Sequence, residues 1–229
     1  MTIRAQSHEN PFALSLSKCR AAFGLAMRLL LAAAACHAPI GQAAPAHPPA
    51  HASAARPAYS AEKSVALARA QIGVTLAYDS GYTAIAYPGG DVPASRGVCT
   101  DVIIRALRGQ GVDLQRLVHE DMGRAFAQYP SRWGLKRPDA NIDHRRVLNL
   151  EVFMQRQGRA LPVSQNPRDY RAGDWVTWRL GAEQLPHIGM VSDRTAGDGT
   201  PLIIHNIGQG TREENALFAF PIAGHYRWR

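Results

Sequence analysis

Two patterns of hydrophobic and polar positions follow one another along the chain from residue 60 onward. Up to residue 158, apolar residues recur at helical spacing between capping and helix-breaking residues, which predicts helices. After residue 160, the apolar runs are short, rich in β-branched and aromatic residues and separated by Gly, Pro and Asp, which is typical of strands. The predicted helices cover residues 60–73, 99–109, 113–130 and 143–158, and the predicted strands cover 174–180, 187–193, 201–208 and 225–229.

Helices first and strands second predict an α+β fold, with N-terminal helices packed on a C-terminal antiparallel sheet. The segment 193–200 is rich in Gly, Asp and Thr and joins two predicted strands, so we expect these strands to pair as a hairpin. By contrast, the Gly-, Pro- and Tyr-rich stretch at 78–97 predicts an irregular loop. Residues 60–229 are therefore predicted to form one domain of ordinary size.

The residues before this domain lack both patterns. Residues 1–43 contain the positively charged Arg28, an apolar run from Leu29 to Cys36 and then a small-residue segment, an order typical of a leader with a signal peptide. The run is shorter than the roughly 20 apolar residues that a membrane span needs, so we expect no transmembrane span. Residues 44–59 are rich in Ala, Pro and His and predict a flexible linker.

The leader predicts a periplasmic or secreted protein. Translation could start at Met1 or at Met27, because the residues between them fit no pattern. Cys36 is a candidate for lipid attachment, although Ala33 stands where a larger aliphatic residue is usual.

The charge of the chain bears on its partners. The whole chain has a net charge of +8, which falls to +5 without residues 1–43, and a charge of +5 suits contact with an anionic polymer such as a cell wall. The sequence contains no stripe of Lys and Arg with interleaved aromatic residues, so we expect no nucleic-acid partner. We also expect the domain to be a monomer.

Cys99 is the only cysteine of the predicted domain, since Cys19 and Cys36 belong to the leader. An exported domain with one thiol cannot form an internal disulfide, so the thiol is either a buried, inert residue or is kept for its chemistry. The segment "GVCTD" places Cys99 at the start of a predicted helix. There the helix dipole and unpaired N–H groups favour a thiolate and a lowered pKa.

A nucleophilic thiol needs an imidazole to take its proton and a polar group to orient that imidazole. His187 opens the strand "HIGMVSD", and His205 lies in the neighbouring strand "PLIIHNIG". Asn206 is an alternative orienting group, but strand neighbours face opposite ways, so only one of His205 and Asn206 can point at the site. Each histidine could instead be a hydrogen-bonded core residue.

Further candidates surround this predicted triad. In "NIDHRR", Arg145 and Arg146 fall in the first turn of a predicted helix, where they could clamp a substrate carboxylate. Alternatively, Asp139 and Asp143 offset them on a solvated face, or Asp143 ties an arginine to the core. A zinc site made of the two strand histidines with Asp101 or Asp193 is also open, although no sequence motif shows zinc-ligand spacing.

The segments "GVCTDV", "AGDWVTW", "HIGMVSD" and "IIHN" resemble those of NlpC-type cysteine peptidases, which cleave cell-wall peptides on a papain-like α+β core. The resemblance implies Cys99 as nucleophile, His187 as base and His205 as orienting group, with no metal or cofactor. It also implies that Tyr82, in the loop before the cysteine, lines the site. Those peptidases usually have "DCSG" where this chain has "VCTD", so the charge of Asp101 opposes thiolate formation unless it is paired.

A second resemblance covers nearly all of the predicted domain. The segments "YPGGDVP", "GVCTDV", "HEDM", "NIDHRRVLNL" and "GHYRW" resemble the YijF-like family of secreted bacterial proteins, whose function is uncharacterised. Together, the residues and both resemblances lead us to expect an exported cysteine hydrolase that cleaves an amide bond in cell-wall peptide through a thioester. The expected substrate-binding residues are Tyr82, Asp101, Arg145 and Arg146. The alternatives are a non-catalytic cell-wall-binding module on a peptidase-like scaffold and a zinc-dependent hydrolase.

Overall fold

The computed structural model of the chain describes residues 59–229. The predicted leader with Cys36, and the predicted linker up to residue 58, lie outside the described residues. Within residues 59–229, no helix is long and apolar enough to cross a membrane.

The four predicted helices are all present: α1 (Ala61–Arg69), α2 (Cys99–Arg108), α3 (Leu114–Ala125) and α4 (Val147–Arg156). Ser60 caps α1 by accepting a hydrogen bond from the Lys63 N–H, as expected for a serine at this position. Short 3-10 turns lie between the longer elements: η1 (Phe126–Gln128), η2 (Asp143–Arg145) and η3 (Pro167–Asp169).

The start of the fourth helix was predicted wrongly. Residues Asp143–Arg145 form the separate turn η2, and α4 begins only at Val147. Arg145 and Arg146 therefore lie before α4 and not in its first turn.

The expected antiparallel sheet has six strands in the order β3-β8-β4-β5-β6-β7. Every neighbouring pair in it is antiparallel, and β5 and β6 form the predicted hairpin. Two further strands, β1 and β2, pair in parallel within the region predicted to be irregular. The strands are β1 (Ala77–Tyr78), β2 (Arg96–Gly97), β3 (Ala160–Leu161), β4 (Trp175–Leu180), β5 (Leu185–Thr195), β6 (Pro201–Asn206), β7 (Thr211–Glu214) and β8 (Ile222–Tyr226).

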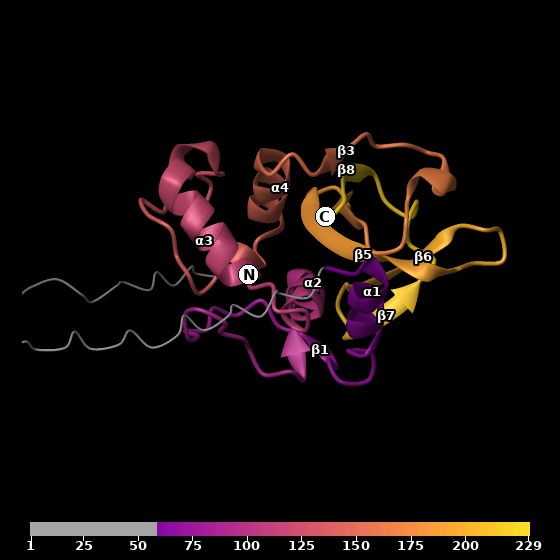
Figure 1. Cartoon of the computed structure of the whole chain (residues 1–229), viewed down its shortest axis with the longest axis horizontal. Coiled ribbons are helices and arrows are strands. Elements are labelled where there is room, and N and C mark those ends of the chain that lie inside the picture. The colour runs from indigo at the N-terminus through magenta and orange to yellow at the C-terminus, as the bar shows by residue number, and fades with distance from the viewer. Residues whose placement is uncertain (1–58) are drawn as a thin grey trace, which may run out of the picture. The chain divides into compact units, whose positions relative to one another are not determined.

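The core lies mainly between the helices and one face of the sheet. In Figure 1, α2 lies between the strands and α3, with α1 beside it. The main apolar cluster joins these helices to Trp175, Met190 and Ile204 of the sheet. A smaller cluster, containing Val191 and Ile203, covers the opposite face. The α+β class, with helices packed on a C-terminal antiparallel sheet, is thus confirmed.

Candidate active site

Cys99 is the first residue of α2, and the residues around it shape a tight start to this helix. The carboxylate of Asp101 turns back and accepts a hydrogen bond of 2.7 Å from the Val98 N–H, which satisfies one of the free donors at the helix start. A Cβ atom on Gly97 would lie 2.7 Å from the same carboxylate oxygen. The glycine before "VCTD" therefore leaves room for this cap.

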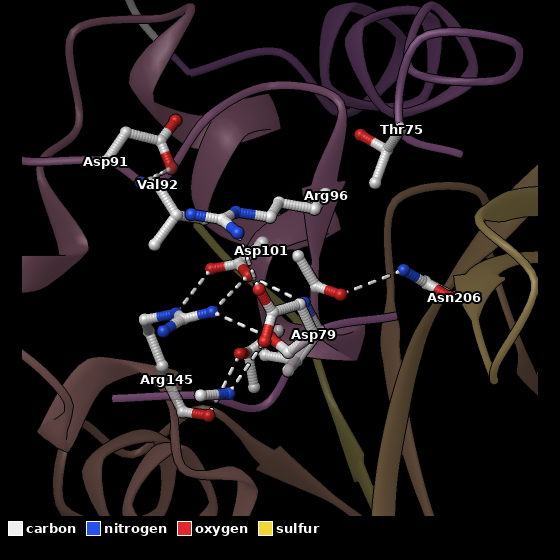
Figure 2. Close-up of polar contacts among 12 residues, drawn as sticks. Thr75, Asp79, Asp91, Val92, Arg96, Asp101, Arg145 and Asn206 are labelled. Carbon is white, nitrogen blue, oxygen red and sulfur yellow. Dashed lines mark hydrogen bonds and ion pairs between the residues drawn. The ribbon is translucent and has the colours of Figure 1, made fainter. Parts of the chain in front are cut away.

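Asp101 is paired with Arg145 inside the protein (Figure 2). The Arg145 Nε donates to Oδ1 at 3.0 Å and its Nη2 donates to Oδ2 at 2.9 Å, a bidentate geometry. The side chains of Arg145 and Asp101 are only 4% and 3% exposed. The charge of Asp101 is therefore compensated, and Arg145 lies neither on a solvated face nor free to clamp a substrate carboxylate.

Arg146 is held in a different way. Its guanidinium binds Asp143 at 2.9 Å and lies 4.2 Å from the ring centre of Trp133, a cation–π arrangement. Asp143 thus ties an arginine to the core, which was one of the readings open from the sequence.

Cys99 is only 3% exposed. Burial raises the pKa of Cys99 to about 11, although hydrogen bonds from the backbone N–H groups of Ile188 and Thr100 favour the thiolate. The expectation of a lowered pKa at the helix N-terminus is therefore wrong for this structure, because desolvation outweighs the dipole and the hydrogen bonds. At neutral pH the resting thiol is protonated.

His187 and His205 are hydrogen-bonded to each other, with Nε2 of His187 2.9 Å from Nδ1 of His205. On its other side, Nε2 of His205 lies 3.1 Å from Oε2 of Glu214. Burial lowers the pKa of His187 to about 3, helped by the neighbouring His205 ring. Burial also lowers the pKa of His205, while Glu214 opposes this shift. Both rings are therefore neutral at neutral pH.

The register of the hairpin brings the two imidazoles together. Met190 pairs with Ile204 and Val191 with Ile203, so Gly189 comes opposite His205. A Cβ on Gly189 would lie 3.2 Å from the Cβ of His205 and 2.5 Å from a methyl carbon of Ile203. The glycine two residues after His187 therefore lets β6 approach closely enough for the histidine pair.

Asn206 points to the opposite side of β6 from His205. Its side-chain amide donates to the carbonyl oxygens of Gly97 at 3.1 Å and Ala77 at 3.3 Å. Asn206 thus fixes the strand that leads into Cys99 and does not contact the His187 ring.

Cys99 and the side chain of His187 lie on different sides of the strand β5. Ile188 and Met190 belong to the main core with Cys99, whereas the alternation of strand residues turns His187 to the face that carries Val191. The sulfur accepts the N–H of Ile188, the residue next to His187. Among residues 59–229, no hydrogen bond directly joins the thiol to the imidazole.

A cleft of about 330 Å³ opens beside Cys99. Its walls are mainly apolar, and Pro186, the residue before His187, is part of them. The lining residues are Tyr78, Ser80, Val98, Cys99, Trp133, Ile142, Arg145, Arg146, Val147, Leu148 and Pro186.

The loop before Cys99 supplies a tyrosine, but not the one expected. The hydroxyl of Tyr78 is hydrogen-bonded to Cys99, and Tyr78 lines the cleft. The hydroxyl of Tyr82 instead accepts a hydrogen bond of 2.8 Å from Asn141 and donates to Asp139 at 3.1 Å. Tyr82 is therefore not at the site in this structure.

The acids considered for a zinc site are bound elsewhere. Asp101 pairs with Arg145, and Asp193 pairs with Arg69. In the described part of the chain, no three His, Cys, Asp or Glu side chains gather so that they could hold a metal ion.

Comparison with known proteins identifies the family. The family model "Domain of unknown function (DUF1287)" matches residues 65–228. The chain belongs to this family. A relative from Escherichia coli (strain K12), named "Uncharacterized protein YijF", is 62% identical over 161 residues, which cover 70% of this chain and 78% of the relative. The resemblance to YijF-like proteins is thus confirmed, and neither name assigns an activity.

Two solved structures are similar to this domain, NlpC1 and NlpC2 from Trichomonas vaginalis. The identities are 12% and 13%, and the TM-scores are 0.37 and 0.39. The alignments cover 73% and 76% of this chain, but only 44% and 49% of those chains. Likeness at this level leaves the activity of the DUF1287 domain to be argued from its own residues.

Sequence reasoning missed two residues of this region, Tyr78 and Glu214. Tyr82 was chosen instead of Tyr78, although Tyr78 belongs to β1 and pairs with Gly97, two residues before Cys99. Glu214 lies in "TREE", where a strand of alternating side chains follows the His205 strand after a short loop. That alternation was the signal that could have found it.

Proposed function

We propose that this protein is an exported cysteine hydrolase that cleaves an amide bond in cell-wall peptide through a thioester intermediate. One observation carries the proposal. The hydrogen-bonded series His187–His205–Glu214 begins next to Ile188, whose N–H binds the sulfur of Cys99. A thiol at a helix start, a neighbouring imidazole and a polar orienting group are the parts that nucleophilic thiol catalysis needs.

The proposed reaction uses these parts in turn. The S–H proton of Cys99 passes to the free Nδ1 of His187 as the sulfur attacks the carbonyl carbon of the amide. The C–N bond then breaks, and the amine leaves with that proton. Water, giving a proton to His187, adds to the thioester and releases the carboxylic acid, and the thiol is restored.

The resting protonation states set the order of these events. Because burial keeps both the thiol and the imidazole neutral, proton transfer accompanies attack and does not precede it. The hydroxyl of Tyr78 and the N–H groups of Ile188 and Thr100 then stabilise the charge that develops on the sulfur. Because Cys99 and His187 lie on different sides of β5, this transfer requires His187 to turn toward the sulfur when substrate fills the cleft.

The cleft indicates what kind of group sits beside the bond that is cleaved. Its two arginines are engaged by Asp101 and Asp143, and most of its wall is apolar. It therefore suits a peptide with an apolar side chain next to the scissile amide better than one with a carboxylate there.

Two observations favour a second candidate, a cell-wall-binding module without catalysis. Burial raises the pKa of Cys99, and no hydrogen bond directly joins it to His187 within the described residues. On this alternative, the cleft binds wall peptide and Cys99 is only a core residue.

Digestion of purified cell-wall peptide fragments separates the two candidates. We expect the mature protein to release new amines, and mass spectrometry to show the matching fragments. Cys99→Ala should abolish release, whereas Tyr82→Phe, a change away from the cleft, should keep it. Equal binding by the wild type and Cys99→Ala, with no product from either, would instead support the binding module.

A further inference from the structure

Glu214 stands at the outer end of a series of hydrogen bonds that leads into the protein. Its side chain is 41% exposed, whereas His205 and His187 are buried. Oε2 of Glu214 lies 3.1 Å from Nε2 of His205, and Nδ1 of His205 lies 2.9 Å from Nε2 of His187. The exposed carboxylate of Glu214 is thus linked through the rings of His205 and His187 to β5, the strand whose Ile188 N–H binds the sulfur of Cys99.

The chemistry of each group fixes the direction of these bonds. A carboxylate can only accept, so Nε2 of His205 carries a hydrogen. A neutral imidazole has one N–H, so Nδ1 of His205 is bare and accepts. Nε2 of His187 must then donate, which leaves Nδ1 of His187 without a hydrogen.

We infer that Glu214 is a positioning residue that sets the tautomers of both histidines and keeps Nδ1 of His187 free to take a proton. This inference deepens the proposed function. The tautomers follow from the hydrogen bonds alone, and only the last step, proton transfer from Cys99 to His187, rests on the proposed function. In serine proteases, a change that leaves the catalytic histidine in the wrong tautomer lowers kcat by about 10⁴-fold.

The register of β6 and β7 explains why Glu214, and not its neighbour, has this place. His205 pairs with Arg212 and Ile203 pairs with Glu214, so Glu214 lies diagonal to His205 on the same face. Glu213 faces the other way, where it binds Arg69 at 2.9 Å.

The surroundings of Glu214 permit a decisive substitution. The charged group near its carboxylate is Arg212, whose Nη1 lies 3.9 Å from Oε1. A cleft of about 370 Å³ opens on the same side and has room for a longer side chain. A lysine at this position can only donate, so it should reverse the direction of every bond in the series.

The test measures the tautomers directly by long-range ¹H–¹⁵N NMR of the histidine rings in the full mature chain. The signals of His187 and His205 are assigned by their loss in His187→Gln and His205→Gln. Glu214→Lys is compared with Glu214→Gln, whose amide oxygen can still accept. Glu183→Lys, at an exposed glutamate of the β4–β5 turn, makes the same change in charge away from the site.

In the wild type we expect the hydrogen of both rings on Nε2. Glu214→Gln and Glu183→Lys should keep this pattern, and Glu214→Lys should move both hydrogens to Nδ1. Alkylation of Cys99 in Glu214→Lys should slow by about 10²–10⁴-fold at neutral pH. A hydrogen on Nδ1 of His187 in the wild type, or unchanged tautomers in folded Glu214→Lys, would overturn the inference.

The outcome is separable from that of the proposed function. If the tautomers switch as expected but wild-type Cys99 never reacts, Glu214 sets the tautomers and the hydrolase proposal fails. If the wild type cleaves wall peptide but its tautomers differ from those expected, the hydrolase proposal stands and the role of Glu214 is refuted.

Discussion

Replacing Arg145 by methionine should destabilise the protein strongly, because it leaves the carboxylate of Asp101 buried without its cation. Both side chains are almost fully buried, and the pair is bidentate with distances of 3.0 and 2.9 Å. Removing one partner of such a pair costs about 3–5 kcal/mol. For a domain of this size, each kcal/mol lowers Tm by about 2–4 °C, so Arg145→Met should lower Tm by about 6–20 °C.

Urea unfolding of three variants measures this effect. Arg116→Met is the matched control, since Arg116 forms a partly exposed pair with Glu120 on α3 and should lose only about 0.3–0.5 kcal/mol. Adding Asp101→Asn to Arg145→Met removes the uncompensated charge and should recover much of the lost stability. A loss in Arg145→Met no larger than that in Arg116→Met would refute the claim that the pair is buried and compensating.

Three further results are expected. The pKa of His187 is about 3 in the folded protein against 6.5 for the free residue, so unfolding takes up a proton between pH 3 and pH 6.5. The stability of the wild type should therefore be full above about pH 6.5 and fall toward pH 3. In urea titrations of His187→Gln, the fall in unfolding free energy over this range should be smaller by on the order of a few kcal/mol. Asn206→Ala should cost about 1–3 kcal/mol in urea unfolding, because the buried carbonyl oxygens of Gly97 and Ala77 lose a donor; an unchanged midpoint would contradict that role. Gly189→Ala should push β5 and β6 apart at His205, which should cost about 1–3 kcal/mol of stability and slow the alkylation of Cys99. Unchanged stability and alkylation would show that the close approach of β6 to Gly189 is not needed.

Local signals in the sequence predicted most of the fold. The capping serine at residue 60, the apolar spacing of the helices and the turn residues between β5 and β6 act over a few positions, so they can be read from the chain directly. The start of α4 could not be read in this way. Arg145, the last residue of η2, pairs with Asp101, which lies 44 residues away in the chain, and a contact of this range leaves no local signal at the start of α4.

The same limit applies to the site. Strand spacing predicted that His187 and His205 lie together, and the structure places Nε2 of His187 2.9 Å from Nδ1 of His205. The thiol pKa was misjudged because a helix start is visible in a sequence, whereas the burial that opposes it depends on the whole core. Glu214 was missed because its diagonal position beside His205 depends on the register across the β6–β7 loop.

The most direct test of the central claim is the rate of iodoacetamide alkylation of Cys99 against pH, in the folded mature protein and in His187→Ala. If His187 is the base for Cys99, the wild type should react at neutral pH and His187→Ala about 10²–10⁴-fold more slowly, which is the usual contribution of general-base assistance. The variant should approach the wild-type rate only near the raised pKa of the thiol, about 11. Equal rates in the two proteins, or no reaction of Cys99 until the protein unfolds, would contradict the pairing of this thiol with His187.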